Sequence, residues 1–353
     1  MKKAISLLVA MITISAHAQN DVNAPERKNW DRGTLYGKVK SLTVTQKDLD
    51  VVDGKFYASD VESYKFNKNG DVIEHCFVET EDGAAKHQYK YDENRNLIEL
   101  TGYNAKGVII GKYVYTYNEH GKIVNETYYS GKDLANYKRK LVRSYDANGL
   151  QLGGIRYNSK GEIIEKYDFI YNDKGERIKE LFEDCTNIFE YDKNGNRIHE
   201  TIYDTEGNIV KSNKYCYDAM GNRIEEIAFD NEGKIESRVT RKYNEKGLQT
   251  EGIMYNGDGM IIEEAYITYD DNGNIIENTN HTSSEYYKHT RAYTYKYDEK
   301  GREIECDLSS NHIKNKFVSK YDSRNNLVLV HGYEVIGESF YLTRQTTYKI
   351  KYR

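Results

Sequence analysis

The sequence predicts an all-β protein, a long antiparallel meander of short hairpins that forms a coiled or spiral repeat sheet. The first observation is a segment, aromatic-x-Tyr-Asp/Asn-x-x-Gly-Asn/Lys-x-Ile-Glu, that recurs eleven times at a period of 26 residues. A fixed period of this length is typical of repeat architectures. The residue before each Asp or Asn marks the copies at Phe66, Tyr91, Tyr117, Tyr145, Tyr171, Tyr191, Tyr217, Tyr243, Tyr269, Tyr297 and Tyr321.

The second observation is the spacing of glycine, which alternates strictly between 12 and 14 residues in the best-preserved stretch. Each unit therefore contains two turns, and successive turns lie on opposite edges of a sheet. The segments between them are rich in Ile, Val, Thr and Tyr and have the length of ordinary strands. The only proline, Pro25, precedes the repeats, which fits continuous strand pairing. The turn glycines of this stretch are Gly195, Gly207, Gly221, Gly233, Gly247, Gly259 and Gly273.

The residue types at each turn have a physical role. In the turn from Asp192 to Asn196, the carboxylate of Asp192 suits the first position of a type I turn, where it accepts backbone N–H bonds. Gly195 supplies the positive φ that closes the hairpin with a bulge. Some copies lack this glycine, and there we expect Asn94 or Asn325 to take the left-handed conformation, because Asn tolerates it better than most residues do.

The first element is an export signal over residues 1–18. Lys2 and Lys3 precede an apolar run, and Ala16-His17-Ala18 forms a cleavage site of the Ala-x-Ala type. The apolar run is shorter than the roughly 20 residues of a membrane-spanning helix, and no other segment is long enough. We expect cleavage near Ala18 and a mature protein without a membrane span. Residues 19–35 are polar and predict a flexible leader.

Residues 36–353 predict a single repeat domain. We expect its end strands, 35–46 and 344–353, to cap the array, leaving no room for a catalytic C-terminal domain. About two dozen strands follow from the spacing, and a sheet of that size curls into a spiral, an open shell or a barrel-like wrap. Two irregular segments predict surface excursions where binding could concentrate, a turn at 184–187 and a long loop at 279–289.

Composition limits the classes of function. Loss of the signal removes two lysines and shifts the formal net charge from −5 to −7, whereas nucleic-acid-binding proteins carry basic patches. Hydrophobic residues are only 38 % of the chain, which has 34 tyrosines. A thin sheet, wet on parts of both faces, fits this composition better than one thick core. The sequence therefore disfavours a nucleic-acid partner.

Reactive constellations are not evident in the sequence. The four cysteines show no CxxC spacing, which disfavours a zinc site and a disulfide framework. One or two isolated disulfide bridges in an oxidising compartment are still compatible with the sequence. Gly195 comes fourth from Asp192, whereas a calcium-binding EF-hand needs glycine at position six. Carboxylates are so abundant that no pair indicates a glycosidase. We expect no enzyme, no catalytic residue, no cofactor and no metal. The cysteines are Cys76, Cys185, Cys216 and Cys306.

The units YDKNGN, YDAMGN, YDDNGN and YDEKGR resemble the YD repeats of the RHS family of bacterial wall-associated and toxin-delivery proteins, over roughly residues 60–330. The resemblance implies a coiled β-strip, which in long family members wraps into a hollow shell around a C-terminal toxin. This chain is short and lacks the proline- and aspartate-rich segment and the toxin tail of those members. We therefore carry over neither shell closure, self-cleavage, toxin delivery nor catalytic residues.

These observations favour an exported, non-enzymatic interaction scaffold that is secreted, at the cell surface or in the periplasm, with an unknown protein or glycan as partner. Regularly spaced aromatic rings offer large contact area at low entropic cost, so Tyr215, Tyr217, Tyr243 and Tyr269 are the expected binding residues. One alternative is a structural envelope spacer without a discrete ligand. A weaker one is a choline-type carbohydrate-binding module, whose aromatic cages usually need more Trp than the single Trp30.

Overall fold

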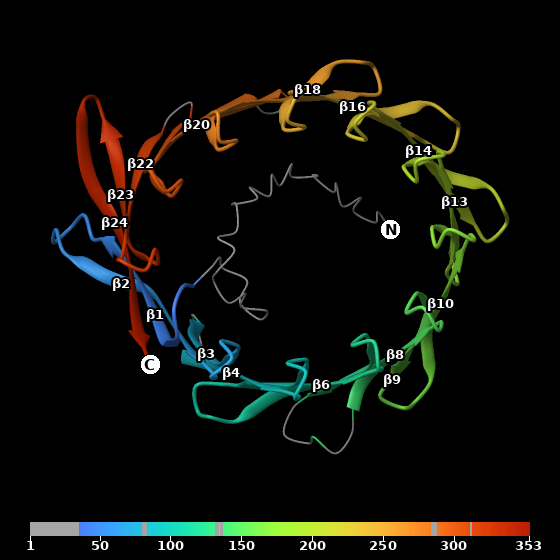
Figure 1. Cartoon of the computed structure of the whole chain (residues 1–353), viewed down its shortest axis with the longest axis horizontal. Helices are drawn as coiled ribbons and strands as arrows, with labels where there is room; N and C mark the ends of the chain where they lie inside the picture. The colour runs from blue at the N-terminus through green and yellow to red at the C-terminus, as the bar shows by residue number, and fades with distance from the viewer. Residues whose placement is uncertain (1–34, 80–82, 131–133, 135–136, 284–287, 311–312) are drawn as a thin grey trace.

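The computed structural model describes residues 35–79, 83–130, 134, 137–283, 288–310 and 313–353. These residues form one antiparallel sheet of 24 strands, and Figure 1 shows them arranged as an oval ring. The all-β meander is confirmed, and the described residues contain no helix. The predicted signal at 1–18 and all of the predicted leader except Leu35 lie outside the described residues.

The strands are short and follow one another in chain order around the ring. They are β1 (Val39–Leu49), β2 (Phe56–Phe66), β3 (Val72–Glu79), β4 (Gly83–Tyr91), β5 (Leu97–Tyr103), β6 (Ile109–Tyr117), β7 (Ile123–Ser130), β8 (Tyr137–Tyr145), β9 (Gln151–Asn158), β10 (Ile163–Tyr171), β11 (Arg177–Leu181), β12 (Cys185–Tyr191), β13 (Arg197–Asp204), β14 (Ile209–Tyr217), β15 (Arg223–Phe229), β16 (Ile235–Tyr243), β17 (Gln249–Asn256), β18 (Ile261–Tyr269), β19 (Ile275–Ser283), β20 (Lys288–Tyr297), β21 (Glu303–Ser310), β22 (Lys314–Tyr321), β23 (Leu327–Ile336) and β24 (Ser339–Tyr352).

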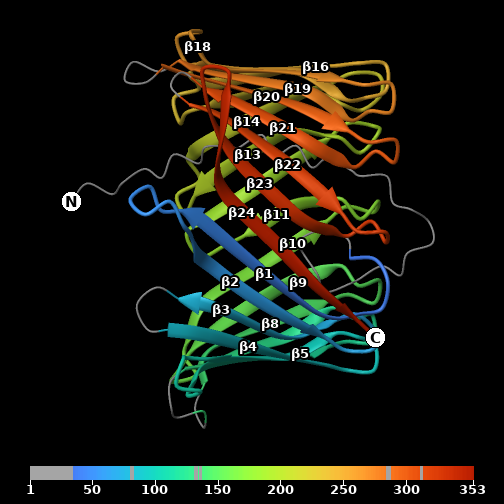
Figure 2. The same cartoon turned by 90° about the vertical axis from the view of Figure 1, so that its left-hand side faces the viewer.

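The sheet closes on itself because its first and last strands pair. β1 and β24 form an antiparallel ladder from Val39 opposite Tyr352 to Asp48 opposite Arg344, and Figure 2 shows the two strands side by side. The prediction of a coiled or spiral strip is corrected to a closed barrel. The segments 35–46 and 344–353, predicted as caps at separate ends, pair with each other instead, because accumulated strand twist brings the two ends of the array together.

The ring is wide for a closed sheet. Neighbouring strands lie about 4.8 Å apart, so 24 strands give a circumference of at least about 115 Å and a mean width of at least about 37 Å. Eight strands enclose a space that side chains just fill, and 16 to 18 strands leave a channel. The strands of this ring therefore enclose a space that their own side chains do not fill.

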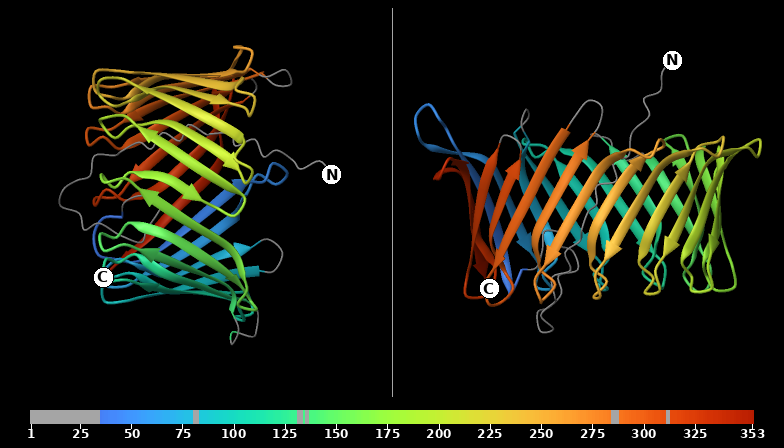
Figure 3. Two further views of the ribbon diagram at one scale, coloured as in Figure 1. Left: turned by 90° about the vertical axis from the view of Figure 1, so that its right-hand side faces the viewer. Right: turned by 90° about the horizontal axis from the view of Figure 1, so that it is seen from above.

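The turns lie on two rims, seen at opposite edges of the tilted strands in the right-hand view of Figure 3. We call tyrosine rim the edge that carries the start of β1 and the eleven turns that follow the residues marking the repeat copies, Phe66 and the ten tyrosines from Tyr91 to Tyr321. The open rim is the opposite edge, with turns such as 204–208 and 256–260. β1 begins and β24 ends at the tyrosine rim, so the first and last described strands meet there.

Both irregular segments differ from their prediction. A tight turn joins β11 to β12, with Phe182 donating its N–H to the Cys185 carbonyl at 2.9 Å, so most of the predicted turn at 184–187 is strand. Residues 279–283 and 288–289 of the predicted long loop are also strand, in β19 and β20. Only 284–287 remain between them, and those lie outside the described residues. Both errors arise because strand pairing with neighbours continues through segments that lack glycine.

The densest apolar packing lies at the seam, which we define as β1, β24 and their neighbours β2 and β23. Leu42 is 1 % exposed and Val39 is 2 % exposed. Leu42 lies opposite both Tyr64 of β2 and Ile350 of β24, so its burial links the two ends of the sheet. The buried cluster comprises Leu35, Val39, Leu42, Tyr64, Phe66 and Val72.

Candidate functional site

The turns of the tyrosine rim share one hydrogen-bonding pattern. In the turn after Tyr191, the N–H groups of Asn194 and Asn196 donate to Asp192 Oδ1 at 2.8 and 2.9 Å, and Asn196 Nδ2 donates to Asp192 Oδ2 at 3.0 Å. The side-chain bond from Asn196, followed by the backbone bonds, lowers the pKa of Asp192. Gly195 has φ 84°. This pattern gives the rim a repeating set of rigid turns.

A tyrosine bonds ten of these eleven turns to the neighbouring unit; the first turn follows Phe66, which has no hydroxyl. The Tyr217 hydroxyl donates to the carbonyl oxygen of Arg197, the first residue of β13, at 2.8 Å. Ten tyrosines make the equivalent bond at 2.6 to 3.0 Å, which explains why the motif has Tyr before Asp or Asn. They are Tyr91, Tyr117, Tyr145, Tyr171, Tyr191, Tyr217, Tyr243, Tyr269, Tyr297 and Tyr321.

The four tyrosines expected to bind a partner have structural bonds. Tyr243 and Tyr269 donate to the carbonyls of Arg223 and Gln249 at 3.0 and 2.7 Å, as Tyr217 does to Arg197. Tyr215 is 9 % exposed, and its hydroxyl donates to Glu200 at 3.0 Å. Burial, with the negative charge of Glu200, raises the pKa of Tyr215. The structure brings Tyr215 and Tyr217 onto one face, and binding by the four stays a prediction.

Neighbouring turns of the tyrosine rim contact one another. A Cβ built on Gly221 would lie 3.9 Å from Asn196 Oδ1 of the preceding turn, and one on Gly247 would lie 3.6 Å from Asn222 Oδ1. On the open rim, by contrast, a Cβ on Gly207, Gly233 or Gly259 would meet nothing within 4 Å among the described residues. Most turns of the tyrosine rim therefore lie against the preceding turn, with Gly301 an exception, whereas most open-rim turns stand apart, with Gly161 an exception.

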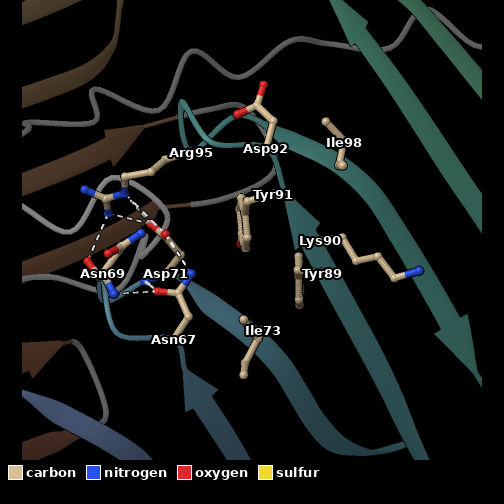
Figure 4. A pocket seen from close by; sticks show the side chains of 10 residues that line it. All are labelled: Asn67, Asn69, Asp71, Ile73, Tyr89, Lys90, Tyr91, Asp92, Arg95 and Ile98. Carbon is tan, nitrogen blue, oxygen red and sulfur yellow. Dashed lines mark hydrogen bonds and ion pairs between the residues drawn. The ribbon is translucent and has the colours of Figure 1, made fainter.

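One turn of the tyrosine rim has an arginine in place of glycine. Arg95 adopts φ 66°, which corrects the expectation that Asn94 takes the left-handed conformation in this copy; Asn325 does so in the other, at φ 67°. Figure 4 shows Arg95 reaching back to Asp71 of the preceding turn. Its Nε lies 3.1 and 3.2 Å from the two oxygens of Asp71, a residue with no exposed surface. The ion pair fixes the unfavourable backbone conformation.

Hollows lie between neighbouring turns at two places on this rim. The first, of about 390 Å³, lies between the turns 67–71 and 92–96 and includes Ile73, Lys90 and Ile98. The second, of about 730 Å³, lies between the turns 146–150 and 172–176. Its lining combines the apolar Leu152 and Ile170 with the polar side chains of Asn148 and Asp173. Both are open surface hollows with apolar and polar groups close together.

The two faces of the sheet differ in chemistry. On the face that carries Tyr215 and Tyr217, arginines stack on rings, as Arg197 does on Phe189 with its Cζ 4.3 Å from the ring centroid. The opposite face carries cross-strand pairs such as Lys242 with Glu251, whose side-chain atoms lie 3.0 Å apart. Such exposed pairs contribute little to stability. The first face is therefore aromatic and half-buried, and the second is charged and hydrated.

A polar clasp closes the tyrosine rim at the seam. Asn326 has no exposed surface and bonds to the backbone of Tyr36, and its Nδ2 also lies 2.7 Å from the Tyr352 hydroxyl. Gly37 has φ 80°, and a Cβ on it would lie 3.4 Å from Arg324 of the preceding turn. The two ends of the described chain thus occupy the place of a twelfth turn. The sequence did not lead us to predict this clasp. The only sequence feature that marked the position was Asn325, which stands where most other turns have glycine.

The remaining groups of the described chain are the cysteines and the side-chain types that bind metals. The four cysteines form no disulfide with one another, and burial raises the pKa of the Cys306 thiol to about 11. Within the described ranges, no cluster of three or more His, Cys, Asp or Glu side chains has the geometry to hold a metal ion. In the same ranges, no helix has the length and apolarity that a membrane crossing requires.

Comparison with known proteins shows similarity at the level of solved structures alone. No family model and no curated protein matches this sequence. The structure of TcdB2-TccC3-TEV matches 84 % of this chain at 10 % identity with a TM-score of 0.36. The Photorhabdus luminescens Tc holotoxin pore matches 80 % at 11 % identity and 0.28. A porin-like protein from Bacteroides uniformis matches 89 % at 9 % identity and 0.25, and 96 % of that chain is covered.

The two Tc toxin chains are much longer than this one. The chain spans 21 % of the TcdB2-TccC3-TEV chain and 19 % of the holotoxin chain. The neighbours in structure thus include components of Tc toxins. All three TM-scores lie below 0.5, so what these proteins bind or deliver carries no argument for this chain.

Proposed function

We propose that this protein is an exported YD-repeat scaffold without enzymatic activity, whose ring binds a glycan at the cell surface. The observation that supports the proposal best is the same hollow at two units of the tyrosine rim. A site that belongs to the repeat suits a partner that itself repeats, and polysaccharides are such partners. Apolar floors beside amide and carboxylate groups also suit sugars, whose rings have apolar faces and hydroxyl edges.

The hollow between the turns 146–150 and 172–176 offers the sharpest test. Asn148 and Asp173 line it, and within the described part of the chain neither side chain has a hydrogen bond or ion pair. Replacing both by Ala should therefore remove ligand contacts without loosening the turns. Asp258→Ala, in an open-rim turn, is the matched control. Binding to a glycan array that falls for the double variant and not for the control would support the proposal.

Other outcomes of this experiment are equally informative. Equal glycan binding by both variants would place the site elsewhere. Absence of glycan binding together with a specific cell-surface protein in a pulldown would assign a protein partner instead. Hydrolysis of a glycan by the purified chain would contradict the non-enzymatic assignment. The export part is tested separately, by N-terminal sequencing of the mature protein, which should begin at Gln19. An intact Met1 in the cytoplasm would contradict it.

An envelope spacer is the second candidate, because regular units and paired strands are also what a spacer requires. Deleting residues 146–171, which removes one side of the hollow, or residues 197–222, a regular unit outside it, distinguishes the two functions. A spacer should lose stability in a graded way and keep its phenotype. A scaffold with a localised site should lose its phenotype with one deletion and keep it with the other.

A further inference from the structure

One free strand edge of the described sheet lies at the seam. β24 has 14 residues, and β1 pairs with it only as far as Arg344. The segment Ser339–Leu342 pairs with β23 on one side, Thr343 forms a bulge after it, and no described strand lies against the other side. Figure 2 shows the β1–β2 and β23–β24 hairpins diverging beyond their last pair. Free strand edges offer a row of unpaired N–H and C=O groups to another chain.

The hairpin fixes which groups point outward. Its loop is Gly337-Glu338, and Ile336 lies opposite Ser339, the pair that is hydrogen-bonded in a two-residue hairpin. Hydrogen-bonded and non-hydrogen-bonded pairs alternate in an antiparallel ladder. Ser339 and Tyr341 therefore direct their N–H and C=O groups to β23. Phe340 and Leu342 direct theirs to the free edge.

Two of the usual protections of a free edge, a charged residue and a proline, are missing here, although the edge is short and has a bulge at Thr343. Natural proteins guard such edges with charges, especially Lys, or with Pro. The segment from Ser339 to Thr343 reads SFYLT and carries neither. Phe340 is 55 % exposed and Tyr341 is 52 % exposed, and Ile336 across the hairpin is 58 % exposed. A short, apolar edge without a charged residue or proline is suited to strand addition.

We propose that this edge pairs with the same edge of a second copy of the chain, in an antiparallel register centred on Tyr341. This register sets Phe340 of each copy opposite Leu342 of the other, so the outward-facing N–H and C=O groups of both residues meet. The two copies together gain four backbone hydrogen bonds. A two-fold axis passes beside Tyr341, and the interface uses the same surface of both copies.

Charge complementarity argues for a second copy over an unrelated strand. The register brings Glu338 of each copy to Arg344 of the other, so opposite charges flank the apolar centre on both sides. Arg344 Nε lies 2.7 Å from Asp48 Oδ1 of its own chain, and the arginine side chain is 51 % exposed. Since a guanidinium has five N–H donors, it can serve both partners. The edge is thus complementary to itself in hydrogen bonds, apolar contacts and charge.

Disulfide trapping tests the register in the full chain. In the proposed dimer, Tyr341 of one copy lies opposite Tyr341 of the other in a non-hydrogen-bonded pair, where side chains lie closest. Tyr341→Cys should therefore form a covalent dimer under oxidation. Glu334 lies opposite Tyr341 on β23, and in the proposed dimer two Glu334 residues would be three strands apart, about 14 Å. Glu334→Cys is therefore the matched control, and it should form no covalent dimer. Equal cross-linking of the two variants would overturn the register.

A second variant tests the edge itself without a cysteine. Leu342→Pro removes an N–H that points outward, so the hairpin keeps its own bonds and the dimer loses two. Sedimentation equilibrium should show a concentration-dependent dimer of the unchanged chain and a monomer of the variant, with the same circular dichroism spectrum. An unchanged chain that is monomeric at all concentrations, or a dimer that persists with Leu342→Pro, would overturn the proposal. Dimers formed only with a strand from another protein would assign the edge to that partner.

Discussion

The side-chain amide of Asn326 exchanges two hydrogen bonds with the backbone of Tyr36, a residue 290 positions away in the sequence. The Tyr36 N–H donates to Asn326 Oδ1 at 2.6 Å, and Asn326 Nδ2 donates to the Tyr36 carbonyl at 3.0 Å. A side chain thus acts as a strand partner for the backbone at the point where the ring closes. The ladder between β1 and β24 continues from this point.

Asn326→Ala should weaken the seam strongly. The variant leaves the N–H and C=O of Tyr36 without their partner beside a fully buried position, and each unsatisfied group costs about 1–3 kcal/mol. We expect the free energy of unfolding in urea to fall by about 2–4 kcal/mol. Asn196→Ala, at the same position of an ordinary turn, is the control and should have a much smaller effect. An equal loss of unfolding free energy in the two variants would show that Asn326 stabilises the protein no more than the Asn of an ordinary turn does.

Tyr217→Phe should cost about 1 kcal/mol of stability, because it removes the hydroxyl that donates to Arg197 and keeps the packed ring. Tyr255→Phe provides the comparison, since that hydroxyl has no such bond to a backbone carbonyl in the described chain. Thermal melting of both variants measures the difference. If Tyr255→Phe lowered the melting temperature as much as Tyr217→Phe, the tyrosine bond would not fasten the units.

Arg95→Gly should destabilise the chain although it restores the glycine of the repeat. Glycine relieves about 1–2 kcal/mol of left-handed strain, but the variant leaves Asp71 buried without its cation, which costs about 3–5 kcal/mol. The expected net loss is about 2 kcal/mol. Gly221→Val isolates the strain, because φ is 84° there and no ion pair is involved, and it should cost about 1–2 kcal/mol. If Arg95→Gly were more stable than the unchanged chain, relief of backbone strain would outweigh loss of the ion pair, and the prediction would be wrong.

Acid should weaken the tyrosine rim through its turn aspartates. Hydrogen bonds from the Asn four residues later lower the pKa of Asp192, Asp218 and Asp270 below the usual 3.8. A lowered folded-state pKa gives stability that is present above the unfolded value and is lost as pH falls through the folded one. The unfolding free energy should therefore decrease below about pH 4.

The Asp-to-Asn triple variant at these three positions tests the acid effect. Asn already occupies the first turn position at Asn118, Asn172 and Asn244, where its Oδ1 accepts the same backbone bonds. The variant should keep its turns and lose less stability than the unchanged chain between neutral and acidic pH. Asp258→Asn changes the charge without removing a hydrogen-bonded carboxylate, and its acid dependence should match that of the unchanged chain. An identical acid dependence of the triple variant would contradict the prediction.

The strands and turns could be predicted from sequence because they depend on local chemistry. The period, the Ile- and Tyr-rich segments and the Asp-to-Gly turns describe the meander of the structure. Closure could not be predicted, because it depends on accumulated twist and on contacts such as Tyr36 with Asn326. The hydrogen bond from Tyr217 to Arg197 could not be predicted either, because it joins two units. The sequence indicated only that a tyrosine recurs at this position. Arg95 was assigned wrongly because an ion pair to a neighbouring turn outweighs local backbone preference.

Because β1 pairs antiparallel with β24, the number of repeats sets the width of the ring. Antiparallel closure requires an even number of strands, and one 26-residue repeat contributes two. Gain or loss of a whole repeat keeps both chain ends on the same rim and changes the circumference by about 10 Å and the width by about 3 Å. Gain or loss of a single strand would separate the ends onto opposite rims and abolish the seam. Duplication of this sequence can therefore tune the diameter in small, fixed steps.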